Sequence, residues 1–183
     1  MKKIILALAF LSYFMFAEEV KELTDEQINT LVKVCESGKD FTNENGTVKY
    51  EEACATLGMI YENIPVLGDL GVKQDLAKAF KFYKKACDGN DYEACSNLGT
   101  LYSEGQGEGV KQDSKKAIKL YTKACDGGYA AGCSNLGVMY SRGQGVEKDF
   151  VKAAARARTI RDFFNILNSV WVPKEARIIT ARA

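Results

Sequence analysis

Residues 94–102 read A-C-S-N-L-G-T-L-Y, and two near copies of this stretch occur elsewhere in the chain of 183 residues. Residues 53–61 read A-C-A-T-L-G-M-I-Y, and residues 132–140 read G-C-S-N-L-G-V-M-Y. A second block alternates with the first: it reads D-L-A-K-A-F-K-F-Y-K-K-A-C-D-G from Asp75 and D-S-K-K-A-I-K-L-Y-T-K-A-C-D-G from Asp113. A two-block period of about 40 residues is typical of stacked supersecondary units rather than of one closed core.

Both blocks have the periodicity of amphipathic helices. Apolar residues recur at helical spacing, as Ala94, Leu98 and Leu101 do in the first block. A glycine stands in the middle of each copy of that block and predicts a close approach by a neighbouring helix; these are Gly58, Gly99 and Gly137. No segment has the pattern of a strand. The sequence therefore predicts an all-α fold, a right-handed α/α solenoid of helix pairs.

The expected helices also carry start signals. Thr24 and Gln27 form a capping-box pair at the first expected helix. Asp75, Asp113 and Asp149 each stand where a helix needs an N-cap acceptor.

The N-terminus indicates export. Residues 1–17 contain two lysines and then an apolar run that ends at Ala17, which is typical of a cleaved secretory signal peptide. The alternative is an uncleaved N-terminal anchor. We expect a periplasmic or secreted protein with no membrane contact after cleavage. Residues 18–153 form the repeat domain in this interpretation, and residues 154–183 form a divergent segment.

The six cysteines suit an oxidising compartment, and an even number in an exported chain predicts a disulfide framework. Two pairs are separated by eight residues at the same place in the repeat. A continuous helix would hold such cysteines about 12 Å apart, whereas a disulfide allows only about 7 Å. The chain must therefore reverse between them, and Asp-Gly turns are present at the required positions. The predicted bridges are Cys87–Cys95, Cys125–Cys133 and, across an eleven-residue insertion, Cys35–Cys54.

Zinc binding is the rival interpretation of the cysteines. Zinc sites usually combine closely spaced cysteine pairs with histidine, and this chain has no histidine. We expect no metal, no cofactor and no free thiol nucleophile.

Charge is distributed unevenly along the chain. Residues 18–153 hold 17 basic and 22 acidic side chains, while residues 154–183 hold 6 and 2. An acidic repeat body argues against nucleic acid as a partner, because phosphate contacts need clustered lysine and arginine.

The last thirty residues depart from the repeat pattern. Ala157 replaces the expected tyrosine, and Arg161 replaces the expected cysteine. One interpretation is a capping helix, in which apolar residues between Ile160 and Trp171 cover the end of the solenoid. The other is a frame slip near codon 154, which would leave a tail unrelated to the repeats.

The pattern A-x-x-x-L-G-x-x-Y, then G-x-G, then D-x-x-K-A-x-x-x-Y-x-x-A resembles Sel1-like repeats, relatives of the tetratricopeptide repeat. With cysteines eight apart and a signal peptide, the chain is similar to the Helicobacter cysteine-rich proteins over residues 25–153. Members of that family are secreted or periplasmic and are commonly named as penicillin-binding proteins with weak β-lactamase activity. The resemblance therefore implies a β-lactam or a peptidoglycan fragment as ligand.

The residues themselves give no catalytic site. A serine β-lactamase needs S-x-x-K and a K-T-G-type strand, and the chain has neither motif. Whether the protein is an enzyme thus stays open, and any catalytic residues are unknown.

Two functions remain after these observations. The first is an exported interaction module that offers a groove to a peptide, a glycan or a protein. The second is a β-lactamase that hydrolyses the amide of penicillins and cephalosporins. Asn97 and Asn135 are the candidate ligand-binding residues, since paired amides suit a peptide backbone or a carboxylate. Alternatively, these two side chains form hydrogen bonds that lock neighbouring repeats together.

Overall fold

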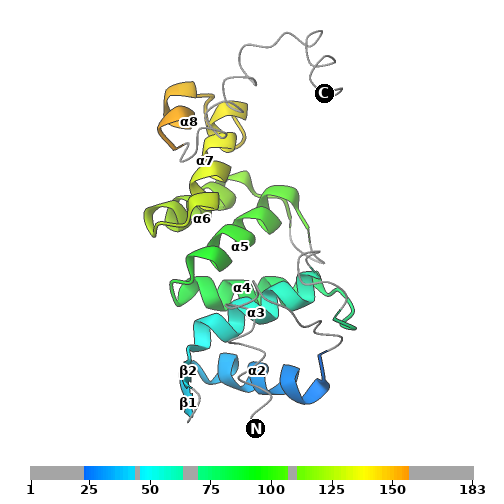
Figure 1. Ribbon diagram of the computed structural model, residues 1–183. Helices are drawn as coiled ribbons and strands as arrows, with labels where there is room; N and C mark the ends of the chain where they lie inside the picture. Colours follow the sequence, from blue (N-terminus) through cyan, green and yellow to red (C-terminus); the bar gives the residue numbers. More distant parts are fainter. Residues whose placement is uncertain (1–22, 44–45, 64–69, 107–110, 157–183) are drawn as a thin grey trace, which may run out of the picture.

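The computed structural model describes residues 23–43, 46–63, 70–106 and 111–156. Consecutive helices pack antiparallel in an elongated stack, with α2 and α8 at opposite ends (Figure 1). The helices are α2 (Asp25–Ser37), α3 (Tyr50–Glu62), α4 (Leu76–Asp88), α5 (Tyr92–Glu104), α6 (Ser114–Asp126), α7 (Ala130–Arg142) and α8 (Phe150–Arg156). The predicted solenoid of helix pairs is confirmed. None of the described helices is both long and apolar enough to span a bilayer.

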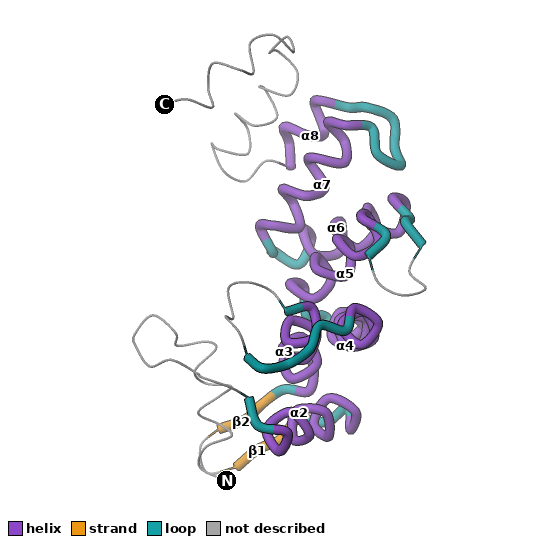
Figure 2. The backbone as a smooth tube through the Cα atoms, turned by 90° about the vertical axis from the view of Figure 1, so that its right-hand side faces the viewer, coloured by secondary structure: helices purple, strands orange, loops and turns teal. Residues whose placement is uncertain are grey.

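The helices form two rows. Helices α3, α5 and α7 contact one another from repeat to repeat, and we call them the inner helices. Helices α4, α6 and α8 follow them as the outer helices, and α2 occupies the place of an outer helix ahead of α3. Figure 2 shows the same stack from the side.

The predicted role of the glycines is confirmed at two of three positions. A Cβ atom on Gly58 would overlap the ring of Tyr83, and one on Gly99 would lie 2.8 Å from the ring of Tyr121. Both tyrosines are buried and lie on the next outer helix. Helices α3 and α5 therefore each receive an aromatic ring directly against the backbone. At Gly137 the matching tyrosine position is Ala157, which lies outside the described residues.

Each inner helix joins the following outer helix through the same backbone hydrogen bond. The N–H of Asp75 donates to the carbonyl of Tyr61, and the N–H of Asp113 donates to that of Tyr102, both at 2.8 Å. Asp149 and Tyr140 repeat the bond at 3.0 Å. The connecting loops differ in length, yet this bond closes all of them, so loop insertions leave the helix packing unchanged.

The three predicted disulfides are present: Cys35–Cys54, Cys87–Cys95 and Cys125–Cys133. Each ties the last turn of an outer helix to the first turns of the next inner helix. The Cα atoms are 4.5–4.9 Å apart, because the chain reverses between the paired residues. Closing rings of this size is worth roughly 2–3 kcal/mol each in the chain-entropy account.

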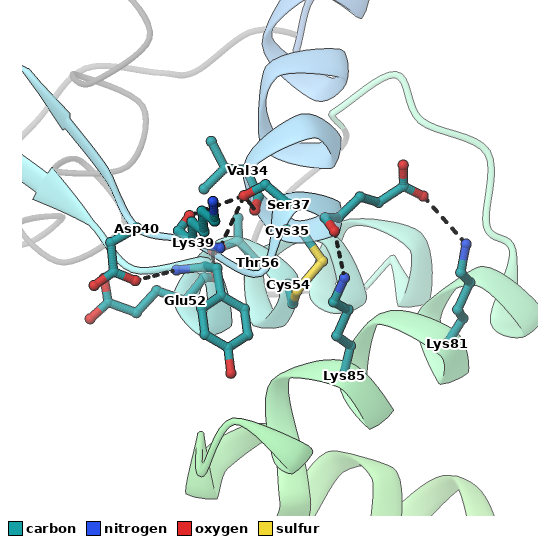
Figure 3. The surroundings of a disulfide bond; sticks show 12 residues. Val34, Cys35, Ser37, Lys39, Asp40, Glu52, Cys54, Thr56, Lys81 and Lys85 are labelled. Atoms are coloured by element: carbon teal, nitrogen blue, oxygen red, sulfur yellow. Dashed lines mark hydrogen bonds and ion pairs between the residues drawn. A yellow bond between two sulfur atoms is a disulfide. The ribbon is translucent and has the colours of Figure 1, made fainter.

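Cations join successive outer helices beside these bridges. Figure 3 shows Lys85, whose Nζ donates to the carbonyl of Glu36 at 3.0 Å, near the Cys35–Cys54 bond. In the next repeat the Nζ of Lys123 donates to the carbonyl of Cys87 at 2.6 Å. Arg156 lies 3.4 Å from the carboxylate of Asp126 one repeat further on. Positive charge at a helix C-terminus is favourable because the helix dipole is negative there.

One expectation was wrong: a short hairpin interrupts the all-helical pattern. Strand β1 (Phe41–Asn43) pairs antiparallel with β2 (Gly46–Val48) inside the eleven-residue insertion. The β-branched residues Thr42, Thr47 and Val48 favour extended backbone, and the two threonine hydroxyls hydrogen-bond across the strands at 2.9 Å. Val48 is buried against the helices, so the hairpin closes the N-terminal side of the core.

Two regions named in the sequence analysis lie outside the described residues. Residues 1–17, the expected signal peptide, are one, and the divergent segment from residue 157 onward is the other. The signal peptide, the domain boundaries and both interpretations of the tail therefore stay predictions.

The N-cap aspartates make stability depend on pH. The predicted caps are confirmed, since each carboxylate of Asp75, Asp113 and Asp149 accepts the backbone N–H three residues on. That hydrogen bond is the main reason that the pKa of each carboxyl lies below its usual value. A lowered pKa in the folded state adds stability that is complete above the unfolded value, near 4, and is lost as pH falls through the folded value.

We therefore expect the melting temperature to fall with acidification below about pH 4, and to fall less in a variant with all three aspartates changed to asparagine. Asparagine still caps a helix but carries no carboxylate in this range. Thermal melts by circular dichroism from neutral to acid pH measure this. Parallel pH profiles for the two proteins would contradict the assignment.

Candidate functional site

The exposed side of the inner helices is the candidate site, and we call it the open face. Its residues recur at positions i, i+4, i+7 and i+11, which lie on one side of a helix. On α5 they are half-buried or exposed, and so are their counterparts on α7. The open face comprises Glu52 and Met59 on α3 with its C-cap residue Asn63, Glu93, Asn97, Thr100 and Glu104 on α5, and Ala131, Asn135, Val138 and Arg142 on α7.

The two predicted asparagines lie at matching places on this face, one repeat apart. Both are half-buried, which leaves part of each amide accessible. Both also have partners within the protein, as the alternative interpretation proposed. Their ligand-binding role stays a prediction.

Asn97 lies at the seam between α3 and α5. Its amide lies close enough to the hydroxyl of Tyr83, which comes from α4, to lower the pKa of that hydroxyl. That hydroxyl also donates a short hydrogen bond to the carboxylate of Glu62, at the end of α3. A carboxylate, a phenol and an amide from three helices thus meet at one point.

Asn135 lies at the next seam, between α5 and α7. Its Nδ2 donates to the Oγ of the buried Ser96 at 3.4 Å. The hydroxyl of Tyr121 reaches the same seam from α6, where it lies 3.1 Å from the Oγ1 of Thr100 and 3.4 Å from the Oγ of Ser103. This seam has the same plan as the first but contains hydroxyls where the first has a carboxylate.

Glu62, Tyr83 and Tyr121 were not predicted from the sequence as parts of these seams. A signal was available, because Tyr83 and Tyr121 each stand eight residues after an N-cap aspartate, and each seam partner directly follows the tyrosine that closes the preceding block. Glu62 follows Tyr61, and Ser103 follows Tyr102. Because the helix pairs repeat, residues at equivalent sequence positions in two repeats occupy equivalent places at the two seams.

The tyrosine hydroxyls that contact Glu62 and Glu93 remain protonated hydrogen-bonding groups. Burial, and then the hydrogen bond to Glu62, raises the pKa of the Tyr83 hydroxyl far above its usual value. Burial, and then the charge of Glu93, raises the pKa of Tyr129 to about 12, and its hydroxyl lies 3.2 Å from the Glu93 carboxylate. Neither phenol supplies a phenolate nucleophile at neutral pH.

The described serines make structural contacts. The hydroxyls of Ser37, Ser103 and Ser141 donate to backbone carbonyls within their own helices. No group of three or more cysteine, aspartate or glutamate side chains among the described residues is placed to hold a metal ion. All six cysteines are in disulfides. What the open face offers is hydrogen bonding and charge.

The charge is segregated between the two rows. Helices α3 and α5 contain five glutamates and no lysine or arginine; the glutamates are Glu51, Glu52, Glu62, Glu93 and Glu104. Helices α4 and α6 contain eight lysines and two aspartates. Within the described residues the salt bridges lie on the outer helices, and none includes a glutamate of α3 or α5. Helices α3 and α5 therefore present unneutralised negative charge.

Comparison with known proteins identifies the repeat. The family model described as the Sel1 repeat matches residues 51–91, 93–129 and 130–155, more than half of the chain. No curated protein matches the chain.

Three solved structures are similar to this chain. A Sel1 repeat protein from Oxalobacter formigenes has 24% identity and a TM-score of 0.62, and the match covers 84% of this chain and 53% of that one. The protein c5321 of uropathogenic Escherichia coli, a protective antigen, has 31% identity and a TM-score of 0.58, with 72% and 24% covered. Cysteine-rich protein B of Helicobacter pylori has 25% identity and a TM-score of 0.46, with 83% and 96% covered. This chain thus spans about half of the first structure and a quarter of the second, and the resemblance expected from the sequence is confirmed.

The seam contacts predict unequal effects of two matched substitutions. Tyr83→Phe removes a donor to the half-buried carboxylate of Glu62, and we expect it to lower the free energy of unfolding by roughly 1.5–3 kcal/mol. Tyr121→Phe removes only contacts to neutral hydroxyls and should cost about 0.5–1.5 kcal/mol. Urea denaturation monitored by circular dichroism measures the free energy of unfolding of both variants. Equal losses, or a larger loss for Tyr121→Phe, would show that Glu62 gains nothing from the bond.

Proposed function

This chain belongs to the Sel1 repeat family, and we propose that it is a periplasmic or secreted binding module that holds an extended peptide or protein segment on the open face. The observation that carries the proposal is the open face itself, where amides recur at one register among glutamates that have no cationic partner. Three disulfides indicate an oxidising compartment outside the cytoplasm, which supports the location.

The spacing of the amides suits an extended ligand. Asn97 and Asn135 belong to adjacent inner helices, whose axes pack about 8–10 Å apart. An extended chain rises about 3.3 Å per residue, so groups roughly three residues apart could meet successive amides. Each amide offers both a donor and an acceptor, which is what a peptide backbone needs.

Charge then selects among peptides. The glutamates on α3 and α5 favour lysine or arginine side chains, and Arg142 on α7 favours an acidic group or a carboxyl terminus at the other end of the ligand. We therefore propose that the preferred ligand is a basic segment. Peptidoglycan fragments and β-lactams, which the family resemblance implies, carry carboxylates, which the glutamates of α3 and α5 repel.

Hydrolysis of β-lactams is the competing function, but the two tyrosine hydroxyls that lie beside a carboxylate, those of Tyr83 and Tyr129, have raised pKa values and supply no phenolate at neutral pH. A chromogenic cephalosporin added to the oxidised protein, with reduced protein as the control, tests it directly. We expect no turnover above the rate in buffer.

Peptide binding can be measured by fluorescence anisotropy with two labelled peptides, one lysine-rich and the other with glutamate in place of lysine. We expect the full chain to bind only the lysine-rich peptide, and less tightly as salt rises from about 0.05 to 0.5 M. The variant Glu52→Gln/Glu104→Gln should weaken binding, whereas the outer-helix control Asp88→Asn/Asp126→Asn should not. Binding of neither peptide, or equal weakening by the control, would refute the proposal.

The asparagines can be tested in the same assay. Asn97→Ala and Asn135→Ala should each lower peptide affinity about fivefold or more, if the folded variants lose a ligand contact of about 1 kcal/mol. If the amides only lock the repeats together, the variants will melt earlier but bind the peptide as the parent does.

A further inference from the structure

We propose that the basic C-terminal segment of this chain, residues 157–183, docks in cis on the glutamates of the open face and competes there with an external ligand. The docking is argued from the opposite charges of the segment and the open face and from the length of the segment. Only the competition rests on the proposed function.

The open face carries glutamates that no described cation neutralises. Glu52, Glu93 and Glu104 are exposed, and no described lysine or arginine forms a salt bridge with them. The lysines of α4 are occupied elsewhere: Lys78, Lys81 and Lys84 pair with Asp75, Glu36 and Asp88. The charge on the inner helices is therefore not neutralised by the outer helices of the same stack.

The segment that follows α8 has the complementary charge. Residues 157–183 contain five basic and two acidic side chains, in contrast to the acidic repeat body. The basic residues are Arg158, Arg161, Lys174, Arg177 and Arg182.

The segment is also long enough to reach every helix of the open face. Its 27 residues could extend to about 90 Å. Five helix-to-helix steps of about 10 Å each separate α8 from α3, so the whole open face lies within reach. Because the segment is covalently attached, its effective concentration at the face is on the order of millimolar, which favours even a weak contact.

The charge pattern also fixes where on the face the segment would bind. Helix α7, which is nearest to α8, contributes no glutamate to the open face and carries Arg142 there, which repels a basic segment. Helices α5 and α3 carry the glutamates. The basic side chains should therefore pass α7 and bind over α5 and α3.

Carbodiimide cross-linking of the oxidised full chain tests the docking without any ligand. Lys174 is the only lysine in the segment, so each cross-link from the segment reports one position. We expect amide links from Lys174 to Glu52, Glu93 or Glu104, and their loss at about 1 M salt, where charges are screened within about 3 Å. Links to Asp88 or Asp126 on the outer helices instead, or no link at low salt, would overturn the proposal.

A mixture of isotopically labelled and unlabelled protein separates cis from trans docking. Cis docking gives links within one isotope class only, and links between the classes would refute it. Neutralising the five basic side chains of the segment with glutamine should then tighten binding of the lysine-rich peptide at least threefold, and unchanged affinity would refute the competition. If the peptide never binds but the cross-links form, the proposed function fails while the docking stands.

Discussion

The contact between a glycine on an inner helix and a tyrosine ring on the next outer helix is the constraint on which this structure depends. At Gly58 and Gly99 any side chain would occupy the volume of the ring, so the two helices pack with a flat aromatic surface against bare backbone. Burying a tyrosine in this way removes a large apolar surface from water. The contact also fixes the place of the tyrosine hydroxyl, which then emerges at the seam beside the open face. Packing and candidate function are linked through this one residue pair.

The remaining contacts repeat around that pair. A disulfide ties each outer helix to the following inner helix, and the same backbone hydrogen bond joins each inner helix to the following outer one. A lysine side chain binds the last turn of the preceding outer helix. A solenoid of this size has few repeats, and each repeat buries little surface alone. Covalent links and helix-end contacts offset that deficit without enlarging the core.

Much of the fold could be predicted because its determinants are local. The capping box at Thr24, the aspartate N-caps and the cysteine spacing each specify geometry within a few residues. The hairpin was missed because its strands have three residues each, too few for an alternating pattern to stand out, although Asn45-Gly46 between β-branched residues is a known hairpin signal. The site was only half predictable. The register of Asn97 and Asn135 followed from the repeat, but their partners lie on other helices and depend on how the repeats stack.

The segregation of charge could also have been counted from the sequence, yet its meaning depends on the fold. Glutamates in one block and lysines in the other are unremarkable in a linear chain. Stacking places the first blocks in the row of inner helices and the second blocks in the row of outer helices. The glutamates of α3 and α5 therefore gather on one side of the stack, and the lysines of α4 and α6 gather on the other. Such a surface selects partners by charge and steers their approach.

A double-mutant cycle at Gly58 and Tyr83 tests the central contact most directly. Alone, Gly58→Ala should lower the free energy of unfolding by about 1–3 kcal/mol, because the new methyl group collides with a buried ring. In the Tyr83→Ala background the ring is gone, and the same change should be neutral or stabilise by up to about 1 kcal/mol, since alanine is the better helix former. An equal cost of Gly58→Ala in both backgrounds would contradict the account.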